Sequence, residues 1–323
     1  MPEGTEAETK TKGVITSLVV NCIEVAGLAV AALITRSTAL RAQTAVNVAE
    51  VAVVVFLLVG VLTSVRDPDE RHPLGHGRER FFWSLFAALG LFVGGGCLVL
   101  DEAVRSALHP MLVHSYLLAY SVLGITAVLD AYSVVIGLRP FLDQAARRNF
   151  TPRAYLRLST DPASVTVIVA GCCAVTGAFI AAAGLVGSQL SRSATPDTIA
   201  SGLIGLLLLS ASFFLIQIDR DLIGGRGVAP STMREMRCLV AAQPGIAEVS
   251  DLFAVVVGPM NVVVDGNVVF DHTLSAAVVE ETIIHTNEEL RKRWPMIQHI
   301  YLTPVPAKAR LISGPKSKPH HSQ

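Results

Sequence analysis

Six long apolar runs dominate this chain, and they constrain its fold more than any other feature. Each run is long enough to form a helix of about 20 residues, which crosses a hydrocarbon core of about 30 Å. The runs cover residues 13–35, 42–65, 81–100, 111–138, 163–188 and 198–218. The sequence therefore predicts an α-helical membrane protein with six transmembrane helices in residues 13–218.

Composition agrees with a membrane protein and argues against several other classes. The 323 residues are 51% hydrophobic and 16% charged, whereas roughly a quarter of a soluble protein is charged. The 26 basic residues balance 26 acidic ones, so no overall field favours a nucleic acid partner. There is no Gly-x-x-x-x-Gly-Lys loop for a nucleotide. We expect a protein that is embedded in lipid and binds a small partner. We do not expect it to be an enzyme.

The basic residues in the loops predict the orientation, because Lys and Arg are retained on the cytoplasmic side. They concentrate after the second run and after the fourth: Arg66, Arg71, Arg78 and Arg80, then Arg139, Arg147, Arg148, Arg153 and Arg157. The first run, which follows the polar segment 1–12, is too long for a signal peptide and lacks its small-residue cleavage site, so it is expected to stay in the mature protein. We therefore predict a multi-pass protein of the cell membrane with both termini in the cytoplasm.

A small cytoplasmic domain is predicted after the sixth run. Residues 219–230 are polar and rich in glycine, as in a linker. Residues 231–305 then give the order α-β-β-α-β of a compact, ferredoxin-like α+β domain, with helices near 232–242 and 274–294 and strands near 246–257, 262–270 and 297–302. Asp265-Gly266 is also a possible hairpin turn that would split the second strand. The tail 306–323 has the composition of a disordered segment.

Ionisable side chains inside apolar runs are candidates for function, since each costs about 2.5 to 3.5 kcal/mol at a helix centre on insertion scales. Glu24, Glu50 and Asp130 are such residues. Gln43, Asn47 and Glu50 are spaced by four and three, which places them on one helix face. This face could conduct a cation or protons, or it could be a hydrogen-bonded seam between helices.

The loop after the second run contains a carboxylate and two imidazoles, Asp69, His72 and His76. These groups suit Zn²⁺ and similar metals. Pro73 and Gly75 disfavour a continuous helix, so the loop must fold to bring the ligands together. The alternative is a polar turn whose histidines bind lipid phosphates or nothing.

Other candidates favour structural roles. Cys172 and Cys173 are adjacent in the fifth run, about 100° apart on a helix, and buried cysteines are usually small hydrophobes. The glycines at 94–96 and the small residues Gly177, Ala181 and Gly184 indicate close helix packing. The histidines of the C-terminal domain, His272, His285 and His299, form no spacing motif and are interpreted as surface residues.

The loop sequence Asp-Pro-Asp-Glu-Arg-His-Pro-Leu-Gly-His-Gly-Arg at 67–78, together with six spans and a following α-β-β-α-β domain, resembles the cation diffusion facilitator (cation efflux) family. The resemblance covers most of the chain. It extends to Ser-Thr-Ala-Leu at 37–40, Phe-Phe-Trp at 81–83, Asp161-Pro162, and the stretch from Pro244 to Leu302. It implies a homodimer that exports Zn²⁺ or a similar divalent ion in exchange for protons, by alternating access, without a resident cofactor.

The resemblance weakens at the membrane site. Where the family has His or Asp, and Asp four residues later, this chain has Val46 and Glu50. The stretch 169–174 that matches the family's fifth-span site contains no carboxylate or imidazole. Asp69, His72 and His76, by contrast, match positions that bind a second metal in family members.

Two hypotheses follow. In the first, the protein is a cation/proton antiporter with a redrawn site made from Glu50, Asn47 or Gln43, and Asp130, with or without a fifth-span cysteine, Cys172. In the second, it is a transport-deficient relative that acts as a metal sensor, scaffold or dimer partner. The sequence favours transport, because an inactive protein has little reason to retain intramembrane charges.

Overall fold

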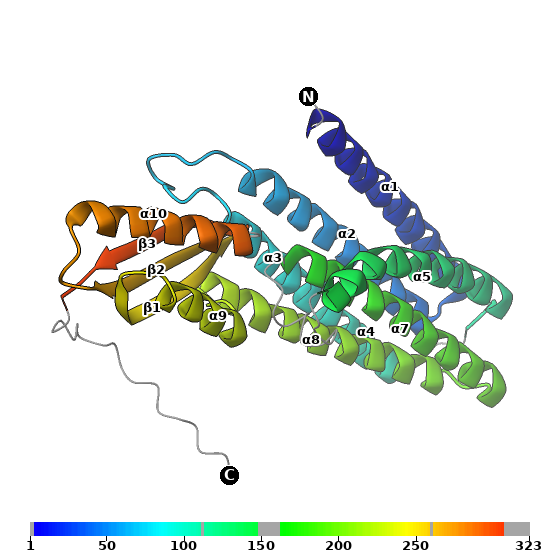
Figure 1. The fold of residues 1–323 in the computed structure, drawn as a ribbon. Helices are drawn as coiled ribbons and strands as arrows, with labels where there is room; N and C mark the ends of the chain where they lie inside the picture. Colours follow the sequence, from blue (N-terminus) through cyan, green and yellow to red (C-terminus); the bar gives the residue numbers. More distant parts are fainter. Residues whose placement is uncertain (1–2, 111–112, 148–161, 259–260, 307–323) are drawn as a thin grey trace, which may run out of the picture. The chain divides into compact units, whose positions relative to one another are not determined.

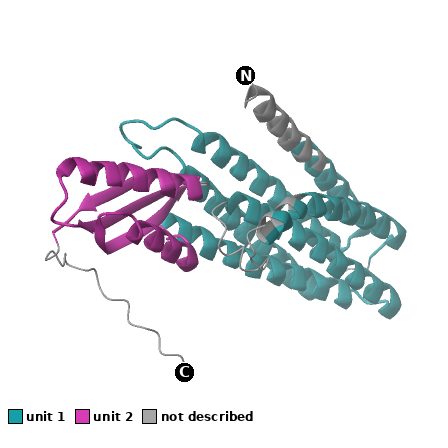
Figure 2. Ribbon diagram, in the orientation of Figure 1, with its two compact units in different colours: residues 1–224 teal, residues 225–323 magenta. Residues whose placement is uncertain are grey.

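The computed structural model describes residues 3–110, 113–147, 162–258 and 261–306. The chain divides into two compact units, Met1–Gly224 and Gly225–Gln323, shown in different colours in Figure 2. The first unit is helical throughout its described secondary structure, and the second contains three strands and two helices. Each unit is described separately below.

The first unit is a bundle of long helices, drawn from blue to green in Figure 1. In chain order they are α1 (Glu3–Thr35), α2 (Thr38–Ser64), α3 (Glu79–Gly90), the π-helix η1 (Leu91–Cys97), α4 (Leu98–Leu108), α5 (Tyr116–Arg147), α7 (Pro162–Ser191) and α8 (Thr195–Ile223). The helix α2 contacts α1, α3, α7 and α8, so it lies at the centre of the bundle.

Five helical stretches in the described residues are long and apolar enough to cross a membrane. They are Thr38–Ser64, Glu79–Leu108, Tyr116–Ile136, Pro162–Ser191 and Thr195–Ile223. The apolar part of α1, Asn21–Thr35, is too short to be counted with these five stretches. The protein is thus a multi-pass, mostly helical membrane protein, and the sixth span remains a prediction.

The helices extend beyond several of the apolar runs. The first helix begins at Glu3, inside the segment 1–12 that was expected to be a polar tail, because Glu, Lys and Ala are good helix formers. The last one, α8, continues to Ile223 rather than ending at residue 218. Asp219 is 1% exposed and Leu222 is 0% exposed. Packing of these side chains keeps the segment helical where the sequence indicated a linker.

Polar side chains at the start of α8 fix the start of α2. Ser37 Oγ donates to Asp197 Oδ1 at 2.8 Å. Asp197 Oδ2 accepts from the backbone N–H groups of Thr38 at 2.5 Å and Ala39 at 3.3 Å. A helix N-terminus has backbone N–H groups without intrahelical partners, so a buried carboxylate there satisfies them. This contact ties two sequence-distant helices together at one end of the bundle.

The third span is interrupted by η1, which contains the glycines at 94–96. A Cβ atom on Gly95 would lie 3.0 Å from Leu208 Cδ1 of α8, and one on Gly96 would overlap Leu209. A Cβ on Gly94 would meet no atom within 4 Å. The close packing indicated by the sequence is therefore present at Gly95 and Gly96, on the face toward α8.

The second unit has the order α9 (Pro230–Ala241), β1 (Ile246–Gly258), β2 (Asn261–Phe270), α10 (Ala276–Arg293) and β3 (Ile297–Pro304). The sheet order is β1-β2-β3, with β1 antiparallel to β2 and β2 parallel to β3. This is a small mixed sheet with the predicted α-β-β-α-β order. The tail predicted to be disordered, apart from residue 306, lies outside the described residues.

The alternative hairpin at Asp265-Gly266 is wrong, because β2 runs through both residues. Phe253 pairs with Asp265, and Leu252 pairs with Gly266. A Cβ at Gly266 would lie 2.6 Å from Leu252 Cδ1 and 2.9 Å from the Asp251 carbonyl oxygen. The glycine permits the two strands to approach closely beside a bulge. An Asp-Gly pair also occurs in hairpin turns, so the sequence alone does not distinguish the two cases.

Gly184 provides a test of packing in the bundle. A Cβ there would overlap Ala200 Cβ and lie 3.2 Å from the Pro196 carbonyl oxygen. Neither atom can rotate away, so we expect Gly184→Ala to destabilise the protein by about 1–3 kcal/mol, as overpacking does. Thermal unfolding in detergent checks this. Gly94→Ala is the control, and equal melting temperatures for the two variants would contradict the close packing.

Candidate metal sites

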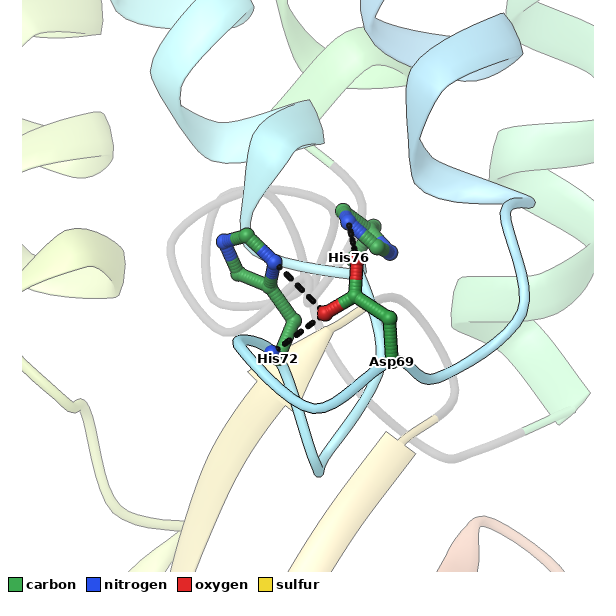
Figure 3. A group of neighbouring side chains, drawn as sticks. All are labelled: Asp69, His72 and His76. Carbon is green, nitrogen blue, oxygen red and sulfur yellow. Dashed lines mark hydrogen bonds and ion pairs between the residues drawn. The ribbon is translucent and has the colours of Figure 1, made fainter.

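The loop between α2 and α3 brings Asp69, His72 and His76 together, as Figure 3 shows. Their possible ligand atoms all lie within 4.8 Å of one another. Among the residues described, this is the one group of at least three His, Cys, Asp or Glu side chains that meets this criterion. The loop is not helical here, which is how side chains on both sides of Pro73 converge.

Asp69 organises this cluster. Its Oδ1 accepts backbone N–H groups from Arg71 at 2.9 Å and His72 at 2.6 Å, and lies 3.1 Å from His72 Nδ1. Its Oδ2 lies 3.5 Å from His76 Nε2. The backbone N–H of His72 holds the pKa of the Asp69 carboxyl below its usual range. Asp69 therefore stays an anionic ligand into acidic solution.

The two imidazoles are held in different ways. Their ring centroids are 4.3 Å apart. The His72 side chain is 49% exposed, whereas that of His76 is 10% exposed. The His76 carbonyl accepts from Glu79 N at 3.0 Å where α3 begins, and Gly75 adopts a positive φ of 79° that suits glycine. The loop thus brings together one carboxylate and two imidazoles, of which the Asp69 and His72 side chains are about half exposed and that of His76 is mostly buried. This is a ligand set for Zn²⁺ and related ions.

The predicted polar face of α2 lies inside the bundle. Gln43 is 0% exposed and Asn47 is 1% exposed. Gln43 Nε2 donates to the Ala174 carbonyl of α7 at 3.2 Å and to Asn47 Oδ1 at 3.4 Å. Gln43 thus makes the type of interhelical bond that the seam hypothesis requires. Glu50 is partly buried on the same helix.

This face also contains unsatisfied polar atoms. Gln43 Oε1, Asn47 Nδ2 and Glu50 Oε1 are buried and have no hydrogen-bond partner among the described residues, and the same is true of Asp130 Oδ2 on α5. Asp130 is 6% exposed and Glu24 of α1 is 8% exposed. The carboxyl groups of Glu24 and Asp130 are near enough to Glu50 to interact with it electrostatically. Unsatisfied polar groups are costly in an apolar interior. The three unsatisfied oxygens, on Gln43, Glu50 and Asp130, are atoms that a cation can bind, whereas Asn47 Nδ2 is a hydrogen-bond donor.

The remaining sequence candidates have separate surroundings. Val46, which precedes Asn47 in α2, is fully buried. In the second unit, His285 Nδ1 lies 3.1 Å from Gln243 Oε1, and the His299 ring stacks on Tyr301 at 6.4 Å between centroids. No group of three metal-type ligands forms around the C-terminal histidines in the part of the chain that the structure describes.

Sequence analysis missed two buried carboxylates on α8, Asp197 and Asp219, each 1% exposed. Both lie just outside the apolar run 198–218, where a carboxylate carries no signal of burial. A buried polar contact also joins α3 to α7, where Ser84 Oγ lies 3.2 Å from Thr166 Oγ1. Only the three-dimensional packing distinguishes Asp197 and Asp219 from ordinary loop residues.

Comparison with known proteins gives a consistent picture. Residues 14–220 match the family model described as the cation efflux transmembrane domain. The chain is 30% identical to metal tolerance protein C4 of Arabidopsis thaliana over 223 residues, which are 69% of this chain and 49% of that protein.

A second set of relatives is similar over 215 residues, or 67% of this chain and 38% of each relative. The proton-coupled zinc antiporter SLC30A9, mitochondrial, is 26% identical in Xenopus laevis and 27% identical in Homo sapiens. The chain thus spans less than half the length of these relatives.

Asp69→Asn tests the loop cluster. The amide keeps the shape but removes the anionic ligand, so we expect the affinity of the loop for Zn²⁺ to fall by about 10-fold or more. Isothermal titration of the purified protein measures this. Asp67→Asn is the control, since Asp67 lies in the same loop outside the cluster. Equal losses for both variants would point to general loop charge rather than a site.

Proposed function

Since the chain belongs to the cation efflux family, we propose that it transports a divalent metal ion across a membrane in exchange for protons, with Zn²⁺ as a substrate. The proposal is supported by the family match over 14–220 and by the names of its relatives, a metal tolerance protein and proton-coupled zinc antiporters. The family is one of transporters, so the chemistry to explain is binding and movement of an ion.

The observation that carries the proposal is the set of unsatisfied polar atoms around Glu50. A carboxylate in a membrane-crossing helix costs free energy unless a cation or proton neutralises it. Glu50 on α2 and Asp130 on α5 are near enough to interact. We propose that these two carboxylates and the Asn47 amide bind the metal and exchange it for protons, in a site altered relative to the family pattern at Val46.

In this proposal, Asp69, His72 and His76 bind a second metal ion at the loop. Their ligand atoms already lie close together, and two of the three side chains are about half exposed. The loop site would therefore equilibrate with metal in solution without a large rearrangement.

We also propose the membrane arrangement. The apolar part of α1 forms the sixth span. The protein lies in the cell membrane with both termini on the cytoplasmic side. The second unit is a cytoplasmic ferredoxin-like domain, at which two copies of the chain form a homodimer. The distribution of Lys and Arg in the loops supports this orientation. The antiporter relatives are named as mitochondrial proteins.

One observation favours a second candidate function, a transport-deficient metal sensor or scaffold. Around Glu50, no three His, Cys, Asp or Glu ligand atoms of the described residues come within 4.8 Å of one another, whereas those of the loop group do. A protein that binds metal only at the loop would have this arrangement. Transport measurements distinguish the two functions directly.

Glu50→Gln tests the transport proposal. The variant keeps the side-chain size and removes the charge that binds metal and protons, so we expect it to abolish Zn²⁺ uptake driven by a pH gradient in proteoliposomes. It should also abolish metal resistance in sensitive cells. The control is Asp101→Asn, an exposed carboxylate that pairs with Arg105 on α4. No wild-type uptake of any divalent ion, despite metal binding, would favour the sensor.

Cys238 tests the orientation, because it is exposed and is the one cysteine of the second unit. A cytoplasmic second unit predicts that a membrane-impermeant maleimide labels Cys238 only after cells are permeabilised. Cys238→Ser identifies the labelled position. Labelling of Cys238 in intact cells would reverse the proposed topology.

A further inference from the structure

Two adjacent cysteines of α7 have different surroundings. Cys172 is exposed on the helix surface, whereas Cys173 is buried, with 5% of its surface exposed. Consecutive residues of a helix point about 100° apart, so one of the pair faces outward and the other faces the bundle. The two thiols are thus the same chemical group in two different environments, so one can serve as the control for the other.

The segment of α7 around Cys173 contacts both helices that carry the unsatisfied carboxylates. The carbonyl of Ala174, the next residue, accepts from Gln43 of α2 at 3.2 Å. A Cβ on Gly171 would lie 2.7 Å from Val134 Cγ2 of α5, one turn from Asp130. Cys173 is also near enough to Glu50 to interact with it electrostatically. The buried thiol therefore belongs to the same region as Glu50 and Asp130.

The unsatisfied atoms are an independent sign that this region binds a ligand. Asp130 is 94% buried, with Oδ2 unpartnered among the described residues, and Gln43 is fully buried, with Oε1 likewise unpartnered there. A cysteine that only filled space would need no such neighbours. Acceptor oxygens and a thiol gathered in an apolar bundle form a ligand set for a metal cation.

We propose that Cys173 is a ligand of the transported metal and, with Glu50 and Asp130, restricts the substrate to borderline and soft divalent ions. The inference rests on the proposed function. Thiolates select Zn²⁺, Cd²⁺ and similar ions, whereas oxygen ligands alone suit Mg²⁺, Ca²⁺ and Mn²⁺. The class of substrate is thus set by one sulfur atom from α7, which adds a soft ligand to an otherwise oxygen-rich site.

Cys173→Ser tests this, because serine keeps nearly the same shape and replaces the sulfur by oxygen. In proteoliposomes at limiting metal, we expect uptake of Zn²⁺ and Cd²⁺ to fall by at least about 10-fold relative to uptake of Mn²⁺, the scale on which disruption of a metal site lowers affinity. Cys172 was a candidate ligand on sequence grounds, but it is exposed on the helix surface, whereas Cys173 is buried. Cys172→Ser is therefore the matched control and should transport all three ions like the wild type. Equal ion preference in Cys173→Ser and the wild type would overturn the proposal.

Two readouts do not depend on transport. Bound Co²⁺ should give a thiolate charge-transfer band in the wild type and in Cys172→Ser, but not in Cys173→Ser. Zn²⁺ should protect Cys173 of the wild-type protein from alkylation, as measured by mass spectrometry, so a variant that fails to fold does not prevent the test. Absence of both the band and the protection would show that Cys173 only packs.

The results separate this inference from the transport proposal. If Glu50→Gln is inactive while Cys173→Ser keeps the wild-type ion preference, transport stands and the role of Cys173 is wrong. If the wild type transports no ion, the transport proposal fails, and the Co²⁺ band with the protection assay decides whether Cys173 is a ligand of a non-transported metal.

Discussion

The free-energy cost of burying polar groups in an apolar bundle is the constraint on which this structure depends. A membrane core offers no water to hydrogen-bond a free N–H, carbonyl or carboxylate, so each must find a protein partner. Asp197 shows how the bundle meets this demand. Its two oxygens accept from Ser37, Thr38 and Ala39 at the start of α2. One buried carboxylate thus satisfies a helix end and also holds α2 against α8.

The centre of the same bundle departs from that rule. Polar atoms on Gln43, Asn47, Glu50 and Asp130 are buried without partners in the described residues. A satisfied group such as Asp197 stabilises one arrangement, whereas an unsatisfied group gains free energy when a cation or proton arrives. The contrast therefore distinguishes Asp197, as a structural carboxylate, from Glu50 and Asp130, which hydropathy alone cannot do. Asp219 of α8 also has a buried oxygen, Oδ2, without a partner in the described residues.

Sequence patterns predicted the membrane class, the family, the α-β-β-α-β order and the loop ligands, because hydropathy, periodicity and motif spacing are local properties. Convergence of Asp69, His72 and His76 followed from the helix-breaking Pro73 and Gly75. The missed features depend on contacts between distant segments. Asp197 looks like a loop residue until α2 is placed beside it, and Gly266 looks like a turn until Leu252 packs against it. The different surroundings of Cys172 and Cys173 likewise depend on which helices cover α7.

The two candidate metal sites differ in how far their ligands must move. At the loop, the three ligand atoms already lie within 4.8 Å of one another, and metal–ligand bonds of about 2.0–2.3 Å need only small adjustments. Around Glu50 the groups come from α2, α5 and α7, and no three His, Cys, Asp or Glu ligand atoms of the described residues lie within 4.8 Å of one another there. Side chains or helices must therefore move to bring these groups onto one ion. An ion that binds the converged arrangement more tightly favours that arrangement by its differential affinity. In an antiporter, this is the step by which binding would be coupled to movement. The free energy that unsatisfied polar atoms gain on binding an ion would then drive the conformational change that transport requires.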